Sequence, residues 1–447
     1  MASLTRISAP FFLLLLLICS INGVSALGID YGQLGDNLLP PQQVVSLLRS
    51  NNIAKARIFD TNPQILTAFA NSDIQLIVTV ENTMLSQLSN PQAAIQWVTT
   101  RIKPYLPATK ITDIMIGNEL DATDLLASLV SAMSSIQKAL SQLGLDSHIK
   151  VSSPFSYGVM EESYPPSAGS FKSDVSDVMS QVLQFLSTTK APFWINAYPY
   201  FVYKGNSKEI LLDYVLFSNA GSSAGMTDPS SNLHYDNLLY AQVDAVIYAI
   251  KALGFDDIEV KVGETGWPSK GDDDELGANL ENAALYNGNL LKRQLTNEGT
   301  PLQPTLDVYV FALFNENKKA GPTSERNFGL FQQAGTVVYN VGLTGYSSAT
   351  NVPPSPPSQS QTKPPITPAT NSSGASSSPS VPSEVSGSAT NSTNTSSLSS
   401  PPKLGLTYSS GAKAATRRSL FLLYVIVGVI IVFFVVICVR SIVRSSR

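Results

Sequence analysis

Cysteine, histidine and charge are all scarce in this sequence. Its 447 residues include two cysteines and two histidines, and 14% of the residues are charged, with a net charge of −4. Both cysteines, Cys19 and Cys438, lie in apolar terminal stretches, so we expect no disulfide and no thiol chemistry in the body of the protein. The weak net charge argues against a nucleic-acid partner.

Motifs for metals and nucleotides are missing as well. His148 and His234 share no metal-ligand spacing, and the sequence has no H-E-x-x-H, no Walker loop and no Gly-rich dinucleotide fingerprint. We therefore expect no metal and no cofactor. Any catalytic chemistry is left to carboxylates.

The first 26 residues carry the pattern of a secretory signal peptide. A basic Arg6 precedes an apolar run at 11–18, and small residues follow up to Ala26. A signal anchor is the weaker alternative, because the apolar run is short for a bilayer. The sequence thus predicts a mature chain that begins at Leu27 and lies outside the cell.

The composition changes after residue 346. Residues 347–419 are rich in Pro, Ser, Thr and Asn, a composition that cannot bury enough apolar surface to fold, and we expect a disordered, glycosylated stalk. N-x-Ser/Thr sites at Asn371, Asn391 and Asn394 fall within it.

An apolar run at 420–439 opens the last segment, 420–447. It is long enough to cross a membrane, and in a transmembrane span the arginines that follow it would favour the cytoplasmic side, which gives a type I topology. A glycolipid-anchor signal is the alternative, with small residues at 409–411 and a polar spacer before the apolar run. Either tether would hold the body at the outer face of the plasma membrane or in the cell wall.

Residues 27–346 alternate short apolar runs with longer amphipathic stretches, which is typical of parallel strands joined by helices. Eight such units favour an α/β fold of the (β/α)8 TIM-barrel type over an open doubly wound sheet, which usually carries a phosphate-loop fingerprint. The expected strands are 27–31, 55–60, 75–80, 113–117, 150–154, 193–198, 259–263 and 307–314, and the clearest helices are 91–103, 125–143, 175–188, 237–253 and 276–297.

Two glutamates stand directly after expected strands. Asn118 and Glu119 follow the fourth strand, and Glu264 follows the seventh, before a loop that Gly266 and Pro268 begin. In a barrel both would face the same rim. A separation of about 5–5.5 Å between the two carboxyl groups suits retaining glycoside hydrolysis, and roughly 6.5–9.5 Å suits inversion. For a lone strand-end glutamate, a surface salt bridge would be the simpler interpretation.

Six segments of this region carry distinctive motifs: 31–32 (YG), 116–119 (IGNE), 196–201 (NAYPYF), 263–269 (GETGWPS), 314–319 (FNENKK) and 325–331 (ERNFGLF). Together they resemble plant endo-β-1,3-glucanases of glycoside hydrolase family 17. The resemblance covers nearly all of residues 27–346 and implies a (β/α)8 barrel, a retaining mechanism and hydrolysis of internal 1,3-β-glucosidic bonds in glucans such as callose. It places the proton donor on Glu119 and the nucleophile on Glu264.

Physical chemistry agrees with these two roles. Glu119 must carry a proton at working pH, so we expect its pKa to be raised by burial and by the neighbouring carboxylate, whereas Glu264 must be ionised to attack. Asn118 could donate to a sugar hydroxyl or cap the turn. Lys319 could balance the clustered carboxylates or be a solvated surface lysine.

Further residues are expected to bind the glucan. Aromatic rings can stack on sugar rings or close the top of the barrel, and for Tyr200 and Phe201 both interpretations stay open. Glu316, Lys319 and Glu325 fall on the supporting polar positions of the family. The expected substrate-binding residues are Tyr31, Asn118, Asn196, Tyr198, Trp267, Glu316, Lys319 and Glu325.

The sequence also departs from the family pattern. Glu81 stands in a turn that is usually uncharged, Asp30 replaces an uncharged residue, and the cysteine-rich carbohydrate-binding domain of many relatives is missing. A transglucosylase on the same barrel and a catalytically silent glucan-binding protein are the alternatives to a hydrolase. We expect a monomer that binds β-1,3-glucan.

Overall fold

The computed structural model describes residues 27–120, 123–218 and 225–343. The predicted signal peptide (1–26), stalk (347–419) and C-terminal apolar segment (420–447) lie outside the described residues. Within these described ranges, no helix is both long and apolar enough to span a bilayer.

The strands close into a barrel, as the sequence predicts. Every neighbouring pair in the nine-stranded sheet is parallel, in the order β5-β4-β3-β2-β1-β13-β12-β9-β6. The two outermost strands, β5 and β6, are consecutive pieces of one segment that Ser153 interrupts, so eight strand positions complete the circle. The strands are β1 Gly28–Asp30, β2 Lys55–Arg57, β3 Gln75–Val80, β4 Lys110–Ile116, β5 Lys150–Ser152, β6 Pro154–Ser156, β9 Phe193–Asn196, β12 Val260–Thr265 and β13 Val308–Val310.

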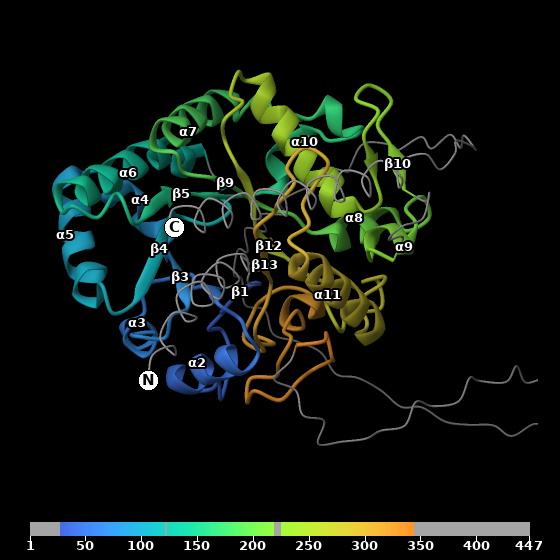
Figure 1. Cartoon of the computed structure of the whole chain (residues 1–447), viewed down its shortest axis with the longest axis horizontal. Helices are drawn as coiled ribbons and strands as arrows, with labels where there is room; N and C mark the ends of the chain where they lie inside the picture. Colours follow the sequence, from blue (N-terminus) through green and yellow to red (C-terminus); the bar gives the residue numbers. More distant parts are fainter. Residues whose placement is uncertain (1–26, 121–122, 219–224, 344–447) are drawn as a thin grey trace, which may run out of the picture. The chain divides into compact units, whose positions relative to one another are not determined.

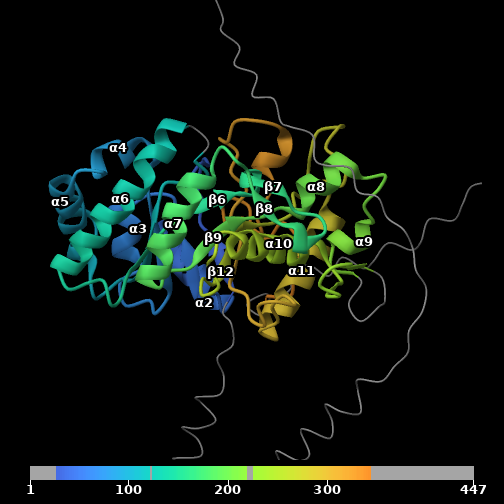
Figure 2. The same cartoon turned by 90° about the horizontal axis from the view of Figure 1, so that it is seen from above.

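The helices lie around these strands (Figure 1). Seen from above, α4, α5 and α6 gather on one side and α8 and α9 on the opposite side (Figure 2). All five expected helices are confirmed, as α5, α6, α7, α10 and α11. The helices are α2 Pro41–Ser50, α3 Pro63–Ala68, α4 Leu85–Leu88, α5 Pro91–Arg101, α6 Thr123–Gln142, α7 Ser176–Thr189, α8 Pro199–Asn206, α9 Leu212–Val215, α10 Leu238–Ala252 and α11 Leu280–Leu295.

The elements that the sequence did not predict are short. Helices α2, α3 and α8 begin with proline, which is tolerated in the first turn because its missing N–H has no intrahelical partner there. In residues 311–343, after β13, the structure has a single 3₁₀ turn and no α-helix. Two antiparallel hairpins sit on loops: β7 Met160–Glu162 with β8 Ser170–Phe171, and β10 Met226–Thr227 with β11 His234–Tyr235.

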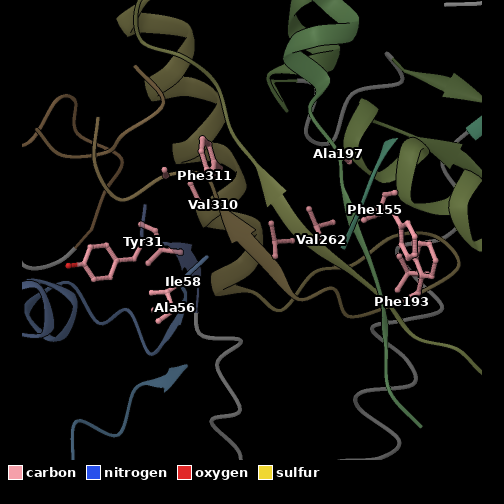
Figure 3. Close-up of a cluster of buried hydrophobic side chains, with 14 of the residues drawn as sticks. Tyr31, Ala56, Ile58, Phe155, Phe193, Ala197, Val262, Val310 and Phe311 are labelled. Carbon is pink, nitrogen blue, oxygen red and sulfur yellow. The ribbon is translucent and has the colours of Figure 1, made fainter. Parts of the chain in front are cut away.

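Two apolar clusters stabilise the barrel. The larger one packs strands against helices, and Figure 3 shows the part where Phe155 and Phe193 stack with ring centroids 5.2 Å apart. The smaller one draws its members from four strands, β3, β4, β9 and β13, a combination that can meet only inside the barrel. It consists of Ile77, Met115, Trp194 and Tyr309.

Candidate active site

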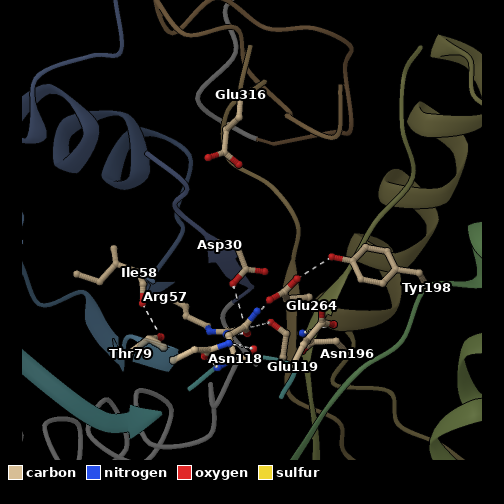
Figure 4. Close-up of polar contacts among 12 residues, drawn as sticks. Asp30, Arg57, Ile58, Thr79, Asn118, Glu119, Asn196, Tyr198, Glu264 and Glu316 are labelled. Carbon is tan, nitrogen blue, oxygen red and sulfur yellow. Dashed lines mark hydrogen bonds and ion pairs between the residues drawn. The ribbon is translucent and has the colours of Figure 1, made fainter. Parts of the chain in front are cut away.

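The two glutamates lie at the carboxyl ends of β4 and β12. Asn196, at the end of β9, connects them. Its Cα pairs in register with that of Glu264, and its Nδ2 donates a hydrogen bond to Glu119 Oε1 at 2.9 Å. Residues far apart in the sequence therefore meet at one rim of the barrel, where loop-borne function gathers in this fold (Figure 4).

Glu264 is held by a cation and a hydroxyl group. Arg57 Nη1 donates to Oε1 at 3.0 Å, and the Tyr198 hydroxyl donates to Oε2 at 2.9 Å. The residue is only 6% exposed, so these charge-assisted bonds act in a poorly solvated site. Both oxygens of the Glu264 carboxyl group are thus fixed in position, as a nucleophile needs.

Glu119 has the opposite surroundings. Burial and then the negative charge of Glu264 raise the pKa of Glu119 to about 7, although the Asn196 hydrogen bond and the charges of Arg57 and Lys319 lower it. About half of the molecules therefore carry a proton on Glu119 at neutral pH. A partly buried carboxyl group of this kind suits a general acid.

Arg57 lies at the centre of this network. It is fully buried on β2, and its Nη1 also donates to the Gly263 carbonyl oxygen at 3.2 Å while its Nη2 donates to Asn118 Oδ1. The sequence analysis did not identify Arg57 as a site residue. The available signal was a charged residue in the middle of a strand whose neighbours are apolar.

Asp30 lies close to Arg57 from the other side. Its Oδ1 is 3.9 Å from Arg57 Nη1, it is fully buried, and neither carboxyl oxygen has a hydrogen-bond partner in the described part of the chain. Burial raises the pKa of Asp30 well above its usual range, and Glu264 adds to this while Arg57 opposes it. The departure noted in the sequence thus places a third carboxyl group behind the pair.

The loop after β13 supplies the supporting polar residues. Lys319 Nζ lies 3.9 Å from Glu316 Oε2 and 3.7 Å from Glu325 Oε2, and it sits 4.1 Å above the ring of Phe311. Lys319 is therefore not a freely solvated surface lysine. Glu316 is buried and accepts a hydrogen bond from the Leu34 N–H at 2.9 Å, and burial raises its pKa despite Lys319.

The expectation for Trp267 as a stacking platform is wrong. Its side chain is 0% exposed, packs between Tyr200 and Tyr286, and donates from Nε1 to the Gly277 carbonyl oxygen. An indole covered in this way has no face left for a sugar ring. Trp267 does follow the end of β12 as expected, but its ring lies among buried aromatic side chains.

The other aromatic residues divide into two groups. Tyr31 and Tyr200 are buried, so they close the top of the barrel rather than offer a broad stacking face. Tyr198 is half-buried and contacts the ring of Phe201 at 5.4 Å between centroids. Phe201 is 44% exposed and is the aromatic ring of this group that is open to a ligand.

Among the described residues, no group of three or more His, Cys, Asp or Glu side chains has the arrangement of a metal site. Glu81 follows β3 on the same rim as the glutamates and is half-buried. It adds negative charge there, as its position in the sequence predicts.

Comparisons with known proteins agree with this site. The model of glycosyl hydrolases family 17 matches residues 27–343. Glucan endo-1,3-beta-glucosidase 14 of Arabidopsis thaliana is 50% identical over 325 residues, which cover 71% of this chain and 82% of the relative. Glucan endo-1,3-beta-glucosidase 11 of the same plant is 46% identical over 350 residues, covering 77% of this chain and 82% of the relative.

Solved structures give the same result. A β-1,3-glucanase and allergen of Cryptomeria japonica pollen, CJP38, is 44% identical and superimposes with a TM-score of 0.67, covering 71% of this chain and 99% of that one. A plant β-glucan endohydrolase is 35% identical, with a TM-score of 0.66 and coverage of 70% and 99%. With the barrel, the paired glutamates and these relatives in agreement, the chain belongs to glycosyl hydrolase family 17.

Proposed function

We propose that this protein is a retaining endo-β-1,3-glucanase. The observation that carries the proposal is the pair of glutamates joined through Asn196, one beside Arg57 and the other with a pKa of about 7. Different surroundings give two chemically identical groups different roles. The printed names of the relatives supply the substrate class, a 1,3-β-glucan.

The proposed reaction has two steps. The Glu264 carboxylate attacks the anomeric carbon while Glu119 donates its proton to the leaving glycosidic oxygen, which forms a glycosyl ester on Glu264. Glu119, now ionised, then removes a proton from water as that water cleaves the ester, and the product keeps the β configuration. Tyr198 and Arg57 hold Glu264 in place, and Asn196 orients Glu119.

The surrounding residues are proposed to bind the glucan. Asn118, Glu316, Lys319 and Glu325 lie on the rim where sugar hydroxyl groups would pass. Phe201 offers an exposed ring beside Tyr198, and we assign to it the stacking role that the buried Trp267 lacks.

We further propose that the enzyme acts outside the cell and is attached to the membrane through its C-terminal segment. The support is the signal-peptide pattern in residues 1–26 and the apolar run at 420–439, which follows a Pro- and Ser-rich stalk. Phosphatidylinositol-specific phospholipase C, applied to intact protoplasts, would release a lipid-anchored protein and leave a transmembrane one attached.

The reaction is tested on laminarin. NMR at early times would show the β anomer first if the mechanism is retaining, and mass spectrometry after treatment with a 2-deoxy-2-fluoro laminaribiosyl fluoride would find the label on Glu264. The variants Glu264→Gln and Glu119→Gln should each lose about 100-fold or more in kcat. Undiminished activity of Glu264→Gln would overturn the assignment.

The product lengths separate hydrolysis from glucosyl transfer. A hydrolase yields only fragments shorter than the starting glucan. A transglucosylase, in which a sugar hydroxyl replaces water in the second step, also yields chains longer than its substrate. Parallel digestion of mixed-linkage and 1,4-β-glucans establishes the linkage preference.

A further inference from the structure

One side-chain amide outside the catalytic pair makes two hydrogen bonds to a single residue beside Glu119. Asn82 Oδ1 accepts from the Asn118 N–H at 2.7 Å, and Asn82 Nδ2 donates to the Asn118 carbonyl oxygen at 3.0 Å. An amide can do this because it carries one acceptor and one donor group side by side, as a peptide does. Asn82 therefore extends the pairing of β3 and β4 after the last paired residues, Val80 and Ile116.

The backbone on either side of Asn118, to which Asn82 is hydrogen-bonded, has positive φ angles. Gly117 has φ +73°, and Glu119 has φ +48°, a left-handed value that residues with a side chain rarely adopt. A Cβ on Gly117 would lie 3.1 Å from Asn82 Oδ1, so the two residues are in close contact. This turn aims the Glu119 carboxyl group at Asn196. Backbone hydrogen bonds hold it on either side, from the Gly117 N–H to the Val80 carbonyl oxygen at 2.9 Å and from the Glu119 N–H to the Pro154 carbonyl oxygen at 3.1 Å. Asn82 supplies the partners of the residue between them, Asn118.

The gripped residue is linked to both catalytic carboxyl groups. Asn118 precedes Glu119 in the chain, and its own side-chain Oδ1 accepts a hydrogen bond from Arg57 Nη2. Arg57 Nη1 in turn binds Glu264. A shift of Asn118 would therefore move the proton donor directly and the nucleophile through Arg57.

We propose that Asn82 is a positioning residue that sets the geometry of Glu119 and Glu264 together. The inference rests on the proposed function because that function assigns the roles of the two glutamates. The contacts of Asn82 are independent of it. Asn82 reaches neither glutamate itself; it acts through Asn118. Its effect should therefore appear in kcat rather than in substrate affinity, since misplacing catalytic groups by about 1 Å can lower the rate about 100-fold.

The test compares Asn82→Ala with Asn90→Ala. Asn90 is a matched control, because its side chain also makes two hydrogen bonds to backbone, to the N–H groups of Gln92 and Ala93 at the start of α5. We expect both variants to lose thermal stability, and Asn82→Ala alone to lose kcat on laminarin, by about 10- to 100-fold, with KM changed less than about threefold. Equal kcat in the two folded variants would overturn the proposal.

A second variant, Asn82→Asp, tests the hydrogen bonds themselves. The introduced carboxylate can accept from the Asn118 N–H but cannot donate to its carbonyl oxygen, whereas the protonated carboxyl group can do both. The ratio of variant to wild-type kcat should therefore rise several-fold as the pH falls to about 4. The charged groups around this site, Glu81, Glu119 and Arg57, are present in both proteins. The introduced carboxylate would raise the pKa of Glu119 in the variant, which preserves its proton at higher pH and therefore changes the ratio in the direction opposite to the one expected here. A ratio that does not change with pH would contradict a role for both hydrogen bonds between the residue 82 side chain and the Asn118 backbone.

Crystal structures of the wild type and Asn82→Ala separate this inference from the proposed function. The proposal predicts a displaced Asn118 peptide and Glu119 carboxyl group in the variant, whatever the substrate is. An unchanged turn would overturn it even if laminarin is hydrolysed. If the wild type were inactive on laminarin, the proposed function would be overturned. The comparison of the two crystal structures would still decide whether Asn82 positions Asn118 and Glu119.

Discussion

The barrel contains charged side chains near both ends of its strands, and the two groups differ in how their charges are matched. Near the amino ends, Lys55 and Lys261 contact Asp307 at 2.7 Å and 2.8 Å. Burial raises the pKa of Asp307, but the two lysines outweigh it and leave that pKa below its usual value. Asp113 of β4 also lies near this group, and burial raises its pKa although Lys261 opposes this. The Asp307 carboxylate itself is matched by the two lysines, so this ion-pair group can stabilise the fold.

Near the carboxyl ends, carboxyl groups outnumber the cations that face them. Arg57 lies 3.0 Å from Glu264 and 3.9 Å from Asp30, and Glu119 completes the group. Burial is the first cause of the raised pKa of both Asp30 and Glu119. The same barrel thus has one end that gains from its charges and one that loses stability to keep a proton available. Such mismatch is typical of functional sites.

We call the cluster at the carboxyl ends, Arg57 with Asp30, Glu119 and Glu264, the unmatched group, and the cluster of Lys55, Lys261 and Asp307 the matched group. The largest effect is expected from removing Arg57, the cation of the unmatched group. Arg57→Met would leave the buried carboxyl groups of Asp30 and Glu264 without a positive neighbour on β2, and we expect kcat on laminarin to fall about 100-fold or more. Lys55→Met is the control from the matched group, and its kcat should stay within about threefold of the wild type. Steady-state kinetics on both folded proteins measure the contrast. Similar losses in the two variants would mean that the ends do not differ in function.

The pH dependence of activity should follow the titration of Glu119, which belongs to the unmatched group. With the pKa of Glu119 at about 7, the protonated donor disappears as the pH rises, so kcat/KM should fall on the basic side with a midpoint near 7. Above that midpoint the loss is about tenfold per pH unit. Profiles of kcat/KM for the wild type and Asp307→Asn measure this. A midpoint that moves in Asp307→Asn would show that the matched group also tunes Glu119.

Much of the barrel and the positions of its two strand-end glutamates could be predicted from the sequence, because strand ends are visible there. The apolar runs located all eight strand positions, and the polar residues directly after them located Glu119 and Glu264. In a parallel barrel the residues that follow the strands lie on one rim, so closure of the barrel places both glutamates there although β4 and β12 are not neighbours in the sheet.

The remaining site residues depend on tertiary packing that no local pattern encodes. Arg57 lies within a strand, and only the closed barrel shows that its side chain faces inward toward Glu264. Trp267 has the composition of a platform, yet it fills space between Tyr200 and Tyr286. Asn82 acts through backbone hydrogen bonds to a turn whose positive φ values appear only in the structure.

Removing a matched charge should lower stability. Asp307→Asn leaves Lys55 and Lys261 facing each other, and we expect the free energy of unfolding to fall by about 1–2 kcal/mol at neutral pH, less than for a fully buried pair because these side chains are partly exposed. The lowered pKa of Asp307 means that its contribution is present above about pH 4 and is lost as the pH falls through the folded-state value. Urea unfolding at several pH values measures both. Equal free energies of unfolding for the wild type and Asp307→Asn at neutral pH would show that the ion pairs of Asp307 with Lys55 and Lys261 do not stabilise the fold.

Removing an unmatched charge should do the reverse, with a smaller effect. The raised pKa of Asp30 means that its protonated form favours the folded state, so stability is full below about pH 4 and is lost as the pH rises toward the folded-state value. Asp30→Asn removes the ionisation and keeps the shape. We expect Tm to rise by about 2–4 °C at neutral pH, which corresponds to about 1 kcal/mol. The gain should be larger at pH 8 than at pH 5, since ionisation of Asp30 in the unfolded wild type favours unfolding increasingly as the pH rises, and the variant has no such group. If Asp30→Asn instead lowered Tm at pH 8, Asp30 would be a true partner of Arg57, and the two ends of the barrel would be matched alike.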